Sequence, residues 1–451
     1  MDQVSILEQS WRDPLDVARP FAQDTYALLL TTPDGWTYFA RDPDNTLRLD
    51  GDDPSDAFAA LSEGLGPCAP AAPEGPPFQG GWAGLISYEF GARAEPVVLK
   101  RHPDWPDLDC GLYRGLLAFH PQRRRLLAIG RGADADAALA RALAAAQWLK
   151  AKGQTTPPGG APLAQTVQAS SGEAYEAVVG QVTARIAAGE IFQANLARRW
   201  QGRLARGATP YDLFERLTGQ SPAPFAGYLR LDSRAVVSNS PERFLSIQAG
   251  DPRRVLAQPI KGTRPRGATP AADADLARAL LADPKDRAEN LMIVDLMRND
   301  VARVCRPGSV KVPALFTLES YANVHHLVST VTGEMTPGCG PADLLRAAFP
   351  PGSITGAPKV QAMKVIAELE PPRGPYCGSL FWAGFDGAMD ASVLIRTVAC
   401  VQDAEGWRFE AGAGGGLVAD SRPVDERLES EAKIAAILRA MTQPVAAQVS
   451  A

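Results

Sequence analysis

The sequence predicts a large protein of the α/β class, and three observations lead to this prediction. The chain has 451 residues, enough for two or three ordinary domains or for one large unit with an appendage. Short apolar segments bounded by glycine, proline and aspartate recur along it, which is typical of strands and tight turns. Other segments place apolar side chains three and four residues apart, which is typical of helices.

Composition and charge exclude several classes of protein. Hydrophobic residues make up 45% of the chain and charged residues 22%, as in soluble globular proteins. The net charge of -5 argues against a nucleic-acid partner, which would require a basic face. No run approaches the roughly 18 apolar residues of a membrane span, and the first residues resemble no secretory signal. Six scattered cysteines without a Cys-x-x-Cys pair indicate neither a disulfide framework nor a zinc site, so we expect a cytoplasmic protein.

The first part of the chain is predicted to be rich in strands. Residues 26–32 and 36–40 are apolar segments separated by Pro33-Asp34-Gly35, a pattern that indicates a hairpin. The glycines within 80–88 indicate a strand packed closely against another backbone. The remaining elements expected here are strands at 112–119 and 125–129 and a helix at 133–151, where Leu139, Leu143 and Trp148 have helical spacing.

A connector is predicted at residues 154–164, which contain two prolines followed by two glycines and show no periodicity. It divides the chain into an N-terminal lobe, residues 1–153, and a second domain, residues 165–443. In the second domain, Ser170 and Glu173 predict a capping box at the start of a helix. Further strands are expected from 191 and at 225–231, 235–238, 244–247, 327–331, 379–382 and 392–401, and further helices at 286–301, 356–369 and 425–441.

Residues 259–267 of this domain combine prolines, glycines and basic side chains within nine positions. They follow an apolar segment, 255–257, so they are predicted to form a tight turn where a strand ends. Two prolines fix the backbone and two glycines let it bend or approach a ligand closely. Three cations, Lys261 among them, project from this frame and suit an anionic small molecule. A basic surface turn explains the same residues equally well.

Carboxylates on two predicted helices could hold a metal ion. Glu289 lies on a helix whose middle is apolar, and Glu426 and Glu429 share one face of the last helix. Buried carboxylates need a cation partner, and Mg²⁺ prefers oxygen ligands of this kind. Taken alone, these residues fit better on an exposed helix surface with pairs such as Glu429 and Lys433.

Glu242 lies in a polar turn, residues 240–244, between two predicted strands. If burial raised its pKa, this carboxyl group could act as a general acid. The alternative is a surface ion pair with Arg243, its neighbour in the sequence.

Three other motifs were tested against known chemistry. The glycine-rich stretches 352–359 and 412–417 both miss the spacing of nucleotide-binding loops, and they fit better as close-approach backbone lining a pocket. Gly338-Cys339-Gly340 resembles a nucleophile elbow, but no histidine follows it in the sequence to activate the thiol. A glutaminase site within this chain is therefore not expected.

Taken together, these motifs resemble those of the chorismate-utilising enzymes, a family that includes anthranilate, aminodeoxychorismate, isochorismate and salicylate synthases. The resemblance covers nearly the whole chain and implies a two-lobed unit of packed, mostly antiparallel β-sheets with helices outside. The N-terminal lobe would then resemble that of anthranilate synthase component I. The matching segments are 189–196, 240–244, 259–264, 288–300, 325–331, 352–359 and 413–421.

Two positions indicate the branch of this family. Members that add water to chorismate carry a water-activating lysine where this chain has Gln193. Anthranilate synthases carry alanine where this chain has Lys261, whereas aminodeoxychorismate synthases carry lysine. The resemblance therefore implies synthesis of 4-amino-4-deoxychorismate, on the route to para-aminobenzoate and folate. Anthranilate synthesis and a non-catalytic chorismate-binding subunit stay open as alternatives.

The resemblance also implies roles for individual residues, a cofactor and a partner. Lys261 would bond covalently to the ring, with Glu242 as general acid, His326 near the reacting ring and Ser353 near the amine-transfer position. Substrate would contact Gly262, Thr263, Tyr376, Arg396, Gly414 and Gly416. Glu289 and Glu429 would hold Mg²⁺, with Glu426 as a further ligand. The ammonia would come from a separate glutamine amidotransferase subunit.

Two points stay open at this stage. Attack by Lys261 requires a neutral amine. Mg²⁺, Arg264 and burial would favour that form, whereas Glu242 and the metal-site carboxylates would favour the ammonium. Some family members bind tryptophan in the N-terminal lobe, but the comparable stretch here, residues 28–34, is short and carries threonines where they have serine.

Overall fold

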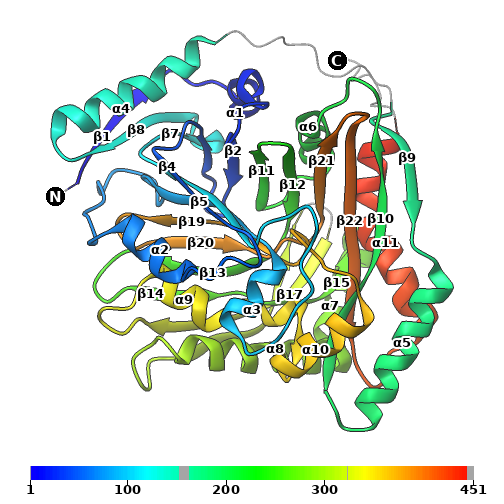
Figure 1. The fold of residues 1–451 in the computed structure, drawn as a ribbon. Helices are drawn as coiled ribbons and strands as arrows, with labels where there is room; N and C mark the ends of the chain where they lie inside the picture. Colours follow the sequence, from blue (N-terminus) through cyan, green and yellow to red (C-terminus); the bar gives the residue numbers. More distant parts are fainter. Residues whose placement is uncertain (1, 152–161, 322–323, 444–451) are drawn as a thin grey trace.

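Two antiparallel β-sheets form the centre of the molecule, and helices lie on their outer sides (Figure 1). The computed structural model describes residues 2–151, 162–321 and 324–443. Within these ranges every strand pairing is antiparallel, which agrees with the fold that the resemblance implied.

The larger sheet of the described residues has twelve strands. Its spatial order is β1 (Gln3–Gln9), β8 (Arg125–Gly132), β7 (Gly115–His120), β3 (Thr37–Ala40), β2 (Leu28–Thr31), β11 (Phe225–Leu231), β12 (Arg234–Ser240), β21 (Thr397–Asp403), β22 (Gly406–Leu417), β10 (Gln193–Leu204) and β18 (Gly356–Ala357), with β9 (Ala164–Ala169) paired to β10.

The smaller sheet has ten strands within the same ranges and crosses the middle of Figure 1. Its spatial order is β15 (Ile260–Pro265), β17 (Val324–Glu334), β14 (Arg254–Ala257), β13 (Arg243–Gln248), β20 (Met389–Ser392), β19 (Ser379–Gly384), β5 (Gly81–Ile86), β6 (Leu108–Tyr113) and β4 (Asn45–Leu49), with β16 (Lys311–Ser320) paired to β17.

Helices cover both sheets from outside: α4 packs on β8 and β1, α11 on β22, and α8 on β17 (Figure 1). The helices are α1 (Pro14–Ala18), α2 (Ala57–Leu65), α3 (Gly91–Ala94), α4 (Ala135–Gln147), α5 (Gly172–Ala187), α6 (Pro210–Gln220), α7 (Pro270–Ala282), α8 (Pro284–Ala302), α9 (Pro341–Ala348), α10 (Lys359–Leu369) and α11 (Pro423–Thr442).

An apolar core lies between the two sheets and fixes their relative position. Tyr38 and Val236 of the larger sheet and Leu85, Leu380 and Trp382 of the smaller one belong to one buried cluster. Two further clusters lie on the outer sides, beneath the helices. Burying apolar area on both faces of each sheet is the main stabilising contribution to such a layered fold.

The first 153 residues contribute strands to both sheets. Strands β1, β2, β3, β7 and β8 belong to the larger sheet, and β4, β5 and β6 to the smaller one. The close backbone packing predicted for 80–88 is confirmed, because a Cβ on Gly81 would lie 2.0 Å from the carbonyl oxygen of Ala383. Most of the predicted connector, residues 154–161, lies outside the described residues, so the boundary between lobe and domain stays a prediction.

Three local predictions were wrong. Residues 260–265 form strand β15 instead of a turn. The helix after the connector is capped by Ser171, whose side chain accepts from the amide of Ala174. The Ser170 hydroxyl accepts instead from the amide of Arg199 on β10. Helix α10 begins at Lys359, three residues later than predicted, because the preceding residues pair with β10 as strand β18.

Six helices, α1, α2, α3, α6, α7 and α9, were not predicted from the sequence. Helix α7 follows the basic motif directly and lies over β15, so it belongs to the surroundings of the candidate site.

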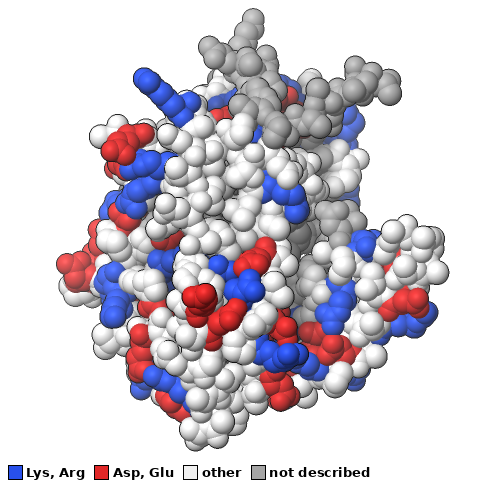
Figure 2. Space-filling view, turned by 90° about the vertical axis from the view of Figure 1, so that its right-hand side faces the viewer, with Lys and Arg blue, Asp and Glu red and all other residues white. Residues whose placement is uncertain are grey.

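The charge and cysteine predictions can be compared with the fold. On the face that carries α5 and α11, acidic and basic side chains are interspersed (Figure 2). All six cysteines are free thiols. Of the described helices, none combines the length and the apolar character needed to cross a bilayer.

Candidate active site

Lys261 lies on the edge strand β15 at a point where the strand pairing is interrupted. The register against β17 shifts between Ile260 and Thr263, and Gly262 has φ +80°, which glycine adopts without strain. Such a bulge bends an edge strand and redirects a side chain out of the ladder. The Lys261 ammonium donates a hydrogen bond to the carbonyl of Ser353, with Nζ and O 3.2 Å apart.

Glu242 is buried beside Lys261, in the turn between β12 and β13. Its side chain accepts hydrogen bonds from the Ser353 hydroxyl and from the amide of Ile260. Burial raises the pKa of Glu242, and these hydrogen bonds and the Lys261 charge only partly oppose that effect. The alternative pairing with Arg243 was wrong, because that guanidinium binds both carboxylate oxygens of Asp390 (2.9 and 3.0 Å). Ser353 thus connects Lys261, through its carbonyl, to Glu242, through its hydroxyl.

Glycines of β22 leave room for neighbouring groups around Lys261. A Cβ on Gly416 would lie 2.0 Å from Gln193 Nε2 and 3.4 Å from Lys261 Nζ. A Cβ on Gly414 would lie 1.8 Å from the carbonyl oxygen of Leu196 on β10, so that position requires glycine for close strand packing. Gln193 is 1% exposed, and its Oε1 has no hydrogen-bond partner among the described residues.

Three carboxylates from α8 and α11 gather near Lys261. Burial raises the pKa of Glu289, and the nearby Lys261 and Lys285 oppose that rise. Glu426 is 4% exposed and accepts from the Ser421 hydroxyl at 2.7 Å. A Cβ on Gly415 of β22 would lie 3.2 Å from Glu426 Oε2 and 3.3 Å from Glu429 Oε1. A side chain at this position would therefore crowd two carboxylates and Lys433, 3.5 Å away.

Two lysines neutralise these carboxylates. Lys285 Nζ lies 3.6 Å from Glu426 Oε1 and 3.9 Å from Glu289 Oε1. Lys433 pairs with Glu429 one helical turn earlier, as the exposed-surface alternative expected, and also donates to the carbonyl of Gly414 at 2.8 Å. Within 2–151, 162–321 and 324–443, no three His, Cys, Asp or Glu side chains stand together in an arrangement that could hold a metal ion.

The two adjacent histidines have different contacts. His326 of β17 lies opposite Thr263 of β15, with Nδ1 and Oγ1 2.9 Å apart. Burial and the charge of Arg396 lower the pKa of His326 to about 4, so its imidazole is neutral near pH 7. His325 binds Ser320 and Asp273 instead (2.7 and 3.0 Å).

Tyr376 lies against β22, and Arg396 lies near Tyr376, Glu429 and Glu242. The Tyr376 ring occupies the space that a Cβ on Gly412 would fill, 2.7 Å from Cδ1. Burial lowers the pKa of Arg396, although Tyr376, Glu429 and Glu242 oppose that effect from nearby. The Arg396 guanidinium makes no hydrogen bond or ion pair within the described part of the chain. A desolvated guanidinium of this kind is well suited to bind a carboxylate in a bidentate manner.

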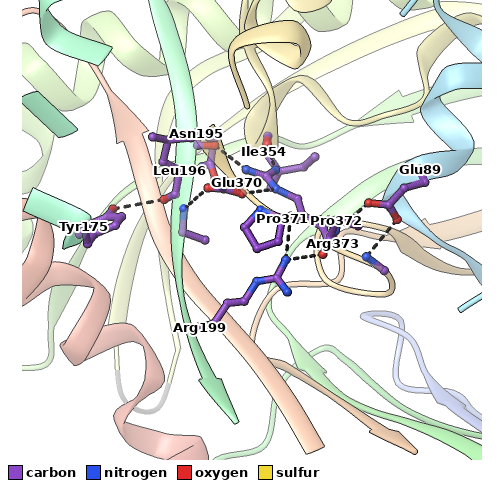
Figure 3. Close-up of polar contacts among 12 residues, drawn as sticks. Glu89, Tyr175, Asn195, Leu196, Arg199, Ile354, Glu370, Pro371, Pro372 and Arg373 are labelled. Atoms are coloured by element: carbon purple, nitrogen blue, oxygen red, sulfur yellow. Dashed lines mark hydrogen bonds and ion pairs between the residues drawn. The ribbon is translucent and has the colours of Figure 1, made fainter. Parts of the chain in front are cut away.

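A buried arginine, Arg373, holds the segments behind the site together (Figure 3). Its guanidinium donates to the carbonyls of Asn195 (2.6 Å) and Ile354 (2.9 Å) and to the carboxylate of Glu370 (2.8 Å). Glu370 in turn accepts a hydrogen bond from an amide of β10 at 2.6 Å. These bonds tie β10 to the segment whose carbonyl binds Lys261.

A residue of the N-terminal lobe completes this arrangement. The Glu89 carboxylate accepts from the backbone amides of Arg373 (2.7 Å) and Gly374 (3.0 Å), and Figure 3 shows it on the opposite side of the loop from Glu370. Burial raises the pKa of Glu89 to about 7. The loop that leads to Tyr376 is thus fixed from both parts of the chain.

Three cavities of the described residues lie outside this cluster. One, of about 10 Å³, is lined by Arg199, Arg373, Tyr376 and Gly412 and has room for about one small molecule the size of water. The second, of about 20 Å³, is lined by residues of β2, β11, β19 and β20. The third, of about 600 Å³, lies between the 102–105 loop and strands β9, β10 and β22. Its lining contains none of the residues predicted to bind substrate, so its size alone does not make it the reaction site.

Three residues of this region were not predicted from the sequence: Lys285, Arg373 and Glu89. Lys285 could have been found from its position one helical turn before Glu289. Arg373 follows two prolines and precedes a glycine, which marks a loop but not its burial. Glu89 carries no such signal, because its partners are about 280 residues away in the sequence.

Comparison with known proteins gives consistent results. The family model described as chorismate binding enzyme matches residues 25–439. Aminodeoxychorismate synthase component 1 of Klebsiella aerogenes is 44% identical over 372 residues, which cover 80% of this chain and 77% of the relative. Anthranilate synthase component 1 of Geobacillus stearothermophilus is 35% identical over 440 residues, 92% of this chain and 84% of the relative. The crystal structure of anthranilate synthase component I from Streptococcus pneumoniae superimposes with a TM-score of 0.79 at 25% identity, covering 90% of this chain and 92% of that one.

Proposed function

The chain belongs to the chorismate binding enzyme family, and from that premise we propose that it is the chorismate-aminating component of an aminodeoxychorismate synthase. It would convert chorismate and ammonia to 4-amino-4-deoxychorismate and water, a step towards para-aminobenzoate and folate. The observation that carries this proposal is the group of Lys261, Ser353 and Glu242, in which a primary amine and a buried carboxyl group share one bridging residue.

Amination would proceed through a covalent bond between Lys261 and the substrate ring. The neutral amine attacks C2, both double bonds of the ring shift by one position, and the hydroxyl at C4 leaves as water with a proton from Glu242. Ammonia then adds at C4, both double bonds shift back, and the lysine, which is a secondary ammonium in the adduct, leaves C2 as a neutral amine. The new ammonium group at C4 returns a proton to Glu242. The raised pKa of Glu242 supports its role, because it favours the protonated form that a general acid needs.

The two carboxylates of chorismate need different partners. Arg396, with Tyr376 beside it and the backbone of Gly414 and Gly416, would bind the enolpyruvyl carboxylate. The guanidinium supports this assignment, because it has no anionic partner among the described residues and can bind a carboxylate in a bidentate manner. His326 would lie near the ring as a neutral hydrogen-bonding group, held by Thr263.

Three carboxylates would hold a magnesium ion: Glu289, Glu429 and Glu426. Their oxygens are the ligand type that Mg²⁺ prefers, and those of Glu426 and Glu429 lie together beside Gly415 of β22. Bound there, the ion would supply positive charge against the ring carboxylate of chorismate. Glu426 is the most deeply buried of the three, which favours a full ligand role for it.

The relatives are named component 1, and we propose that a separate glutaminase subunit supplies ammonia to this chain. A cytoplasmic location is part of the same proposal, and six free thiols support it, because reduced cysteines are typical of that compartment.

The test is incubation of the purified chain with chorismate, Mg²⁺ and ammonium, with the product identified by mass and by its conversion to para-aminobenzoate with a lyase. Release of fluorescent anthranilate and pyruvate would instead assign the chain to anthranilate synthesis, the activity named for relatives at 35% identity. Chorismate binding without turnover, even with ammonium and Mg²⁺ present, would identify a non-catalytic subunit.

A further inference from the structure

We propose that Lys285 acts as an internal substitute for the metal ion, joining the carboxylates of α8 and α11 until a divalent cation displaces its ammonium group. This inference rests on the magnesium site of the proposed function and assigns a role to a residue outside the set of metal ligands and substrate contacts.

The position of Lys285 supports this role. Its Nζ lies 3.9 Å from Glu289 of the same helix and 3.6 Å from Glu426 of α11. The ammonium therefore bridges the first turns of two helices that would both supply ligands to the metal. The Glu426 carboxylate is fixed by its hydrogen bond from Ser421. The side chain of Lys285 therefore moves to meet the carboxylate, which keeps its position.

Local helix energetics do not favour a lysine at this position. Lys285 lies in the first turn of α8, two residues after the capping residue Asp283. The amino end of a helix carries partial positive charge, which repels a cation there. The attraction that compensates this repulsion comes from the carboxylates of Glu426 and Glu289, 3.6 and 3.9 Å from the ammonium.

Of the two lysines in the cluster, Lys285 can leave the carboxylates with the smaller loss of interactions. Its side chain is 46% exposed and ends a flexible stem, so the ammonium can move into water while the helix stays in place. Lys433, the other lysine of the cluster, is anchored by the carbonyl of Gly414 as well as by Glu429. The carboxylate oxygens at Glu289 and Glu426 are largely buried and stay behind.

Displacement of Lys285 by a metal ion explains why Glu289, Glu426 and Glu429 lie near one another without pointing at a single metal position. Two of them point towards Lys285 and the third towards Lys433. A doubly charged ion would replace a single positive charge on Glu289 and Glu426 and would attract both carboxylates more strongly. Metal binding then requires the release of Lys285 from the carboxylates, and the ion pairs of Lys285 compete with metal binding.

The first experiment compares the full-length protein with its Lys285→Met variant, with Lys364→Met, an exposed lysine of α10, as matched control. Titration calorimetry with Mg²⁺ should give a dissociation constant roughly three- to tenfold lower for Lys285→Met, because a partly screened ion pair no longer competes. Without Mg²⁺ this variant should unfold at a lower temperature than the wild type, and saturating Mg²⁺ should remove most of that difference. A weaker or unchanged affinity would overturn the proposal.

The second experiment tests the movement of the side chain in the unsubstituted protein. Acetylation of lysines, followed by mass spectrometry of the peptides, reports how accessible each amine is, with Lys364 as internal reference. Addition of Mg²⁺ should increase the labelling of Lys285 by about twofold, because the released stem becomes fully exposed. Constant or reduced labelling while calorimetry records binding would disprove displacement and leave the proposed function intact. Absence of Mg²⁺ binding in all variants would instead remove the metal site itself.

Discussion

Strands β8 and β22 belong to the same sheet and both contain glycines, but the space beside those glycines is filled differently. In β8, a Cβ on Gly130 would lie 2.3 Å from the carbonyl oxygen of Ala138, and one on Gly132 would lie 2.5 Å from the amide nitrogen of the same residue. The backbone of α4 fills that space. In β22, a Cβ on Gly416 would instead meet the side chains of Gln193 and Lys261.

This difference indicates whether each glycine is needed for stability or for activity. A helix backbone cannot move away from a new methyl group without shifting the whole element, so the glycines of β8 serve stability. Side-chain amides and amines can rotate away, so a methyl group at Gly416 leaves the fold intact and displaces the reacting groups. Stability and activity should therefore separate between the glycines of β8 and Gly416 of β22.

The largest expected effect comes from removing the amine next to Gly416. Lys261→Ala should lower the rate of 4-amino-4-deoxychorismate formation by about a thousandfold or more, because the covalent step is lost. Its free energy of unfolding should change by less than about 1 kcal/mol, since the amine makes one partly exposed hydrogen bond. Rate assays and denaturant unfolding measure the two quantities, and mass spectrometry of wild-type protein with chorismate should detect the adduct. Unchanged product at an unchanged rate would refute the covalent role.

The next effect concerns the proposed acid. Glu242→Gln should lower the rate by about a hundredfold to a thousandfold, the range for loss of a general acid. Protonated Glu242 is the active form, so wild-type activity should decrease as the pH rises through its raised pKa, and the variant should lack that decrease. His326, with a pKa of about 4, stays neutral over this pH range and causes no decrease in activity of its own. Rate-pH profiles of both proteins check this, and identical profiles would contradict it.

A pair of glycine substitutions tests the comparison directly. Gly416→Ala should lower the rate by about tenfold to a hundredfold with little loss of stability, since a misplacement of about 1 Å is enough for such an effect. Gly130→Ala should destabilise the protein by about 1–3 kcal/mol, as overpacking does, while the folded fraction keeps its rate. Unfolding curves and rates per folded molecule distinguish the two. Equal losses of stability in both variants would remove the proposed division.

The smallest effect is expected at the bridging residue. Ser353→Ala keeps the carbonyl that binds Lys261 and removes only the hydroxyl that binds Glu242. The rate should fall by about threefold to tenfold, the cost of one hydrogen bond to a charged group. Since that bond lowers the pKa of Glu242, its removal should move the alkaline limb of the profile to higher pH. A shift towards lower pH would show that the hydroxyl acts otherwise.

The sequence by itself determined the long helices and the chemistry present at the site. The helices predicted at 286–301 and 425–441 are confirmed to within two residues as α8 and α11. Their periodicity and the prolines at their starts act over a few neighbouring residues, so no distant partner is needed to define them. The residue types of the motifs, a lysine, glutamates and glycines in a fixed order, likewise belong to the sequence alone.

Only the tertiary structure decided what those residues face. Residues 260–265 form a strand because β17, about 60 residues away, pairs with them. Helix α4 was predicted correctly, yet it packs through Ala138 and Ala142, whereas Leu139 and Leu143 are 40% and 47% exposed. The contact of Lys261 with Ser353 and of Lys285 with Glu426 likewise spans a large part of the chain. Burial and charge depend on atoms brought together by folding, and local sequence does not contain their distances.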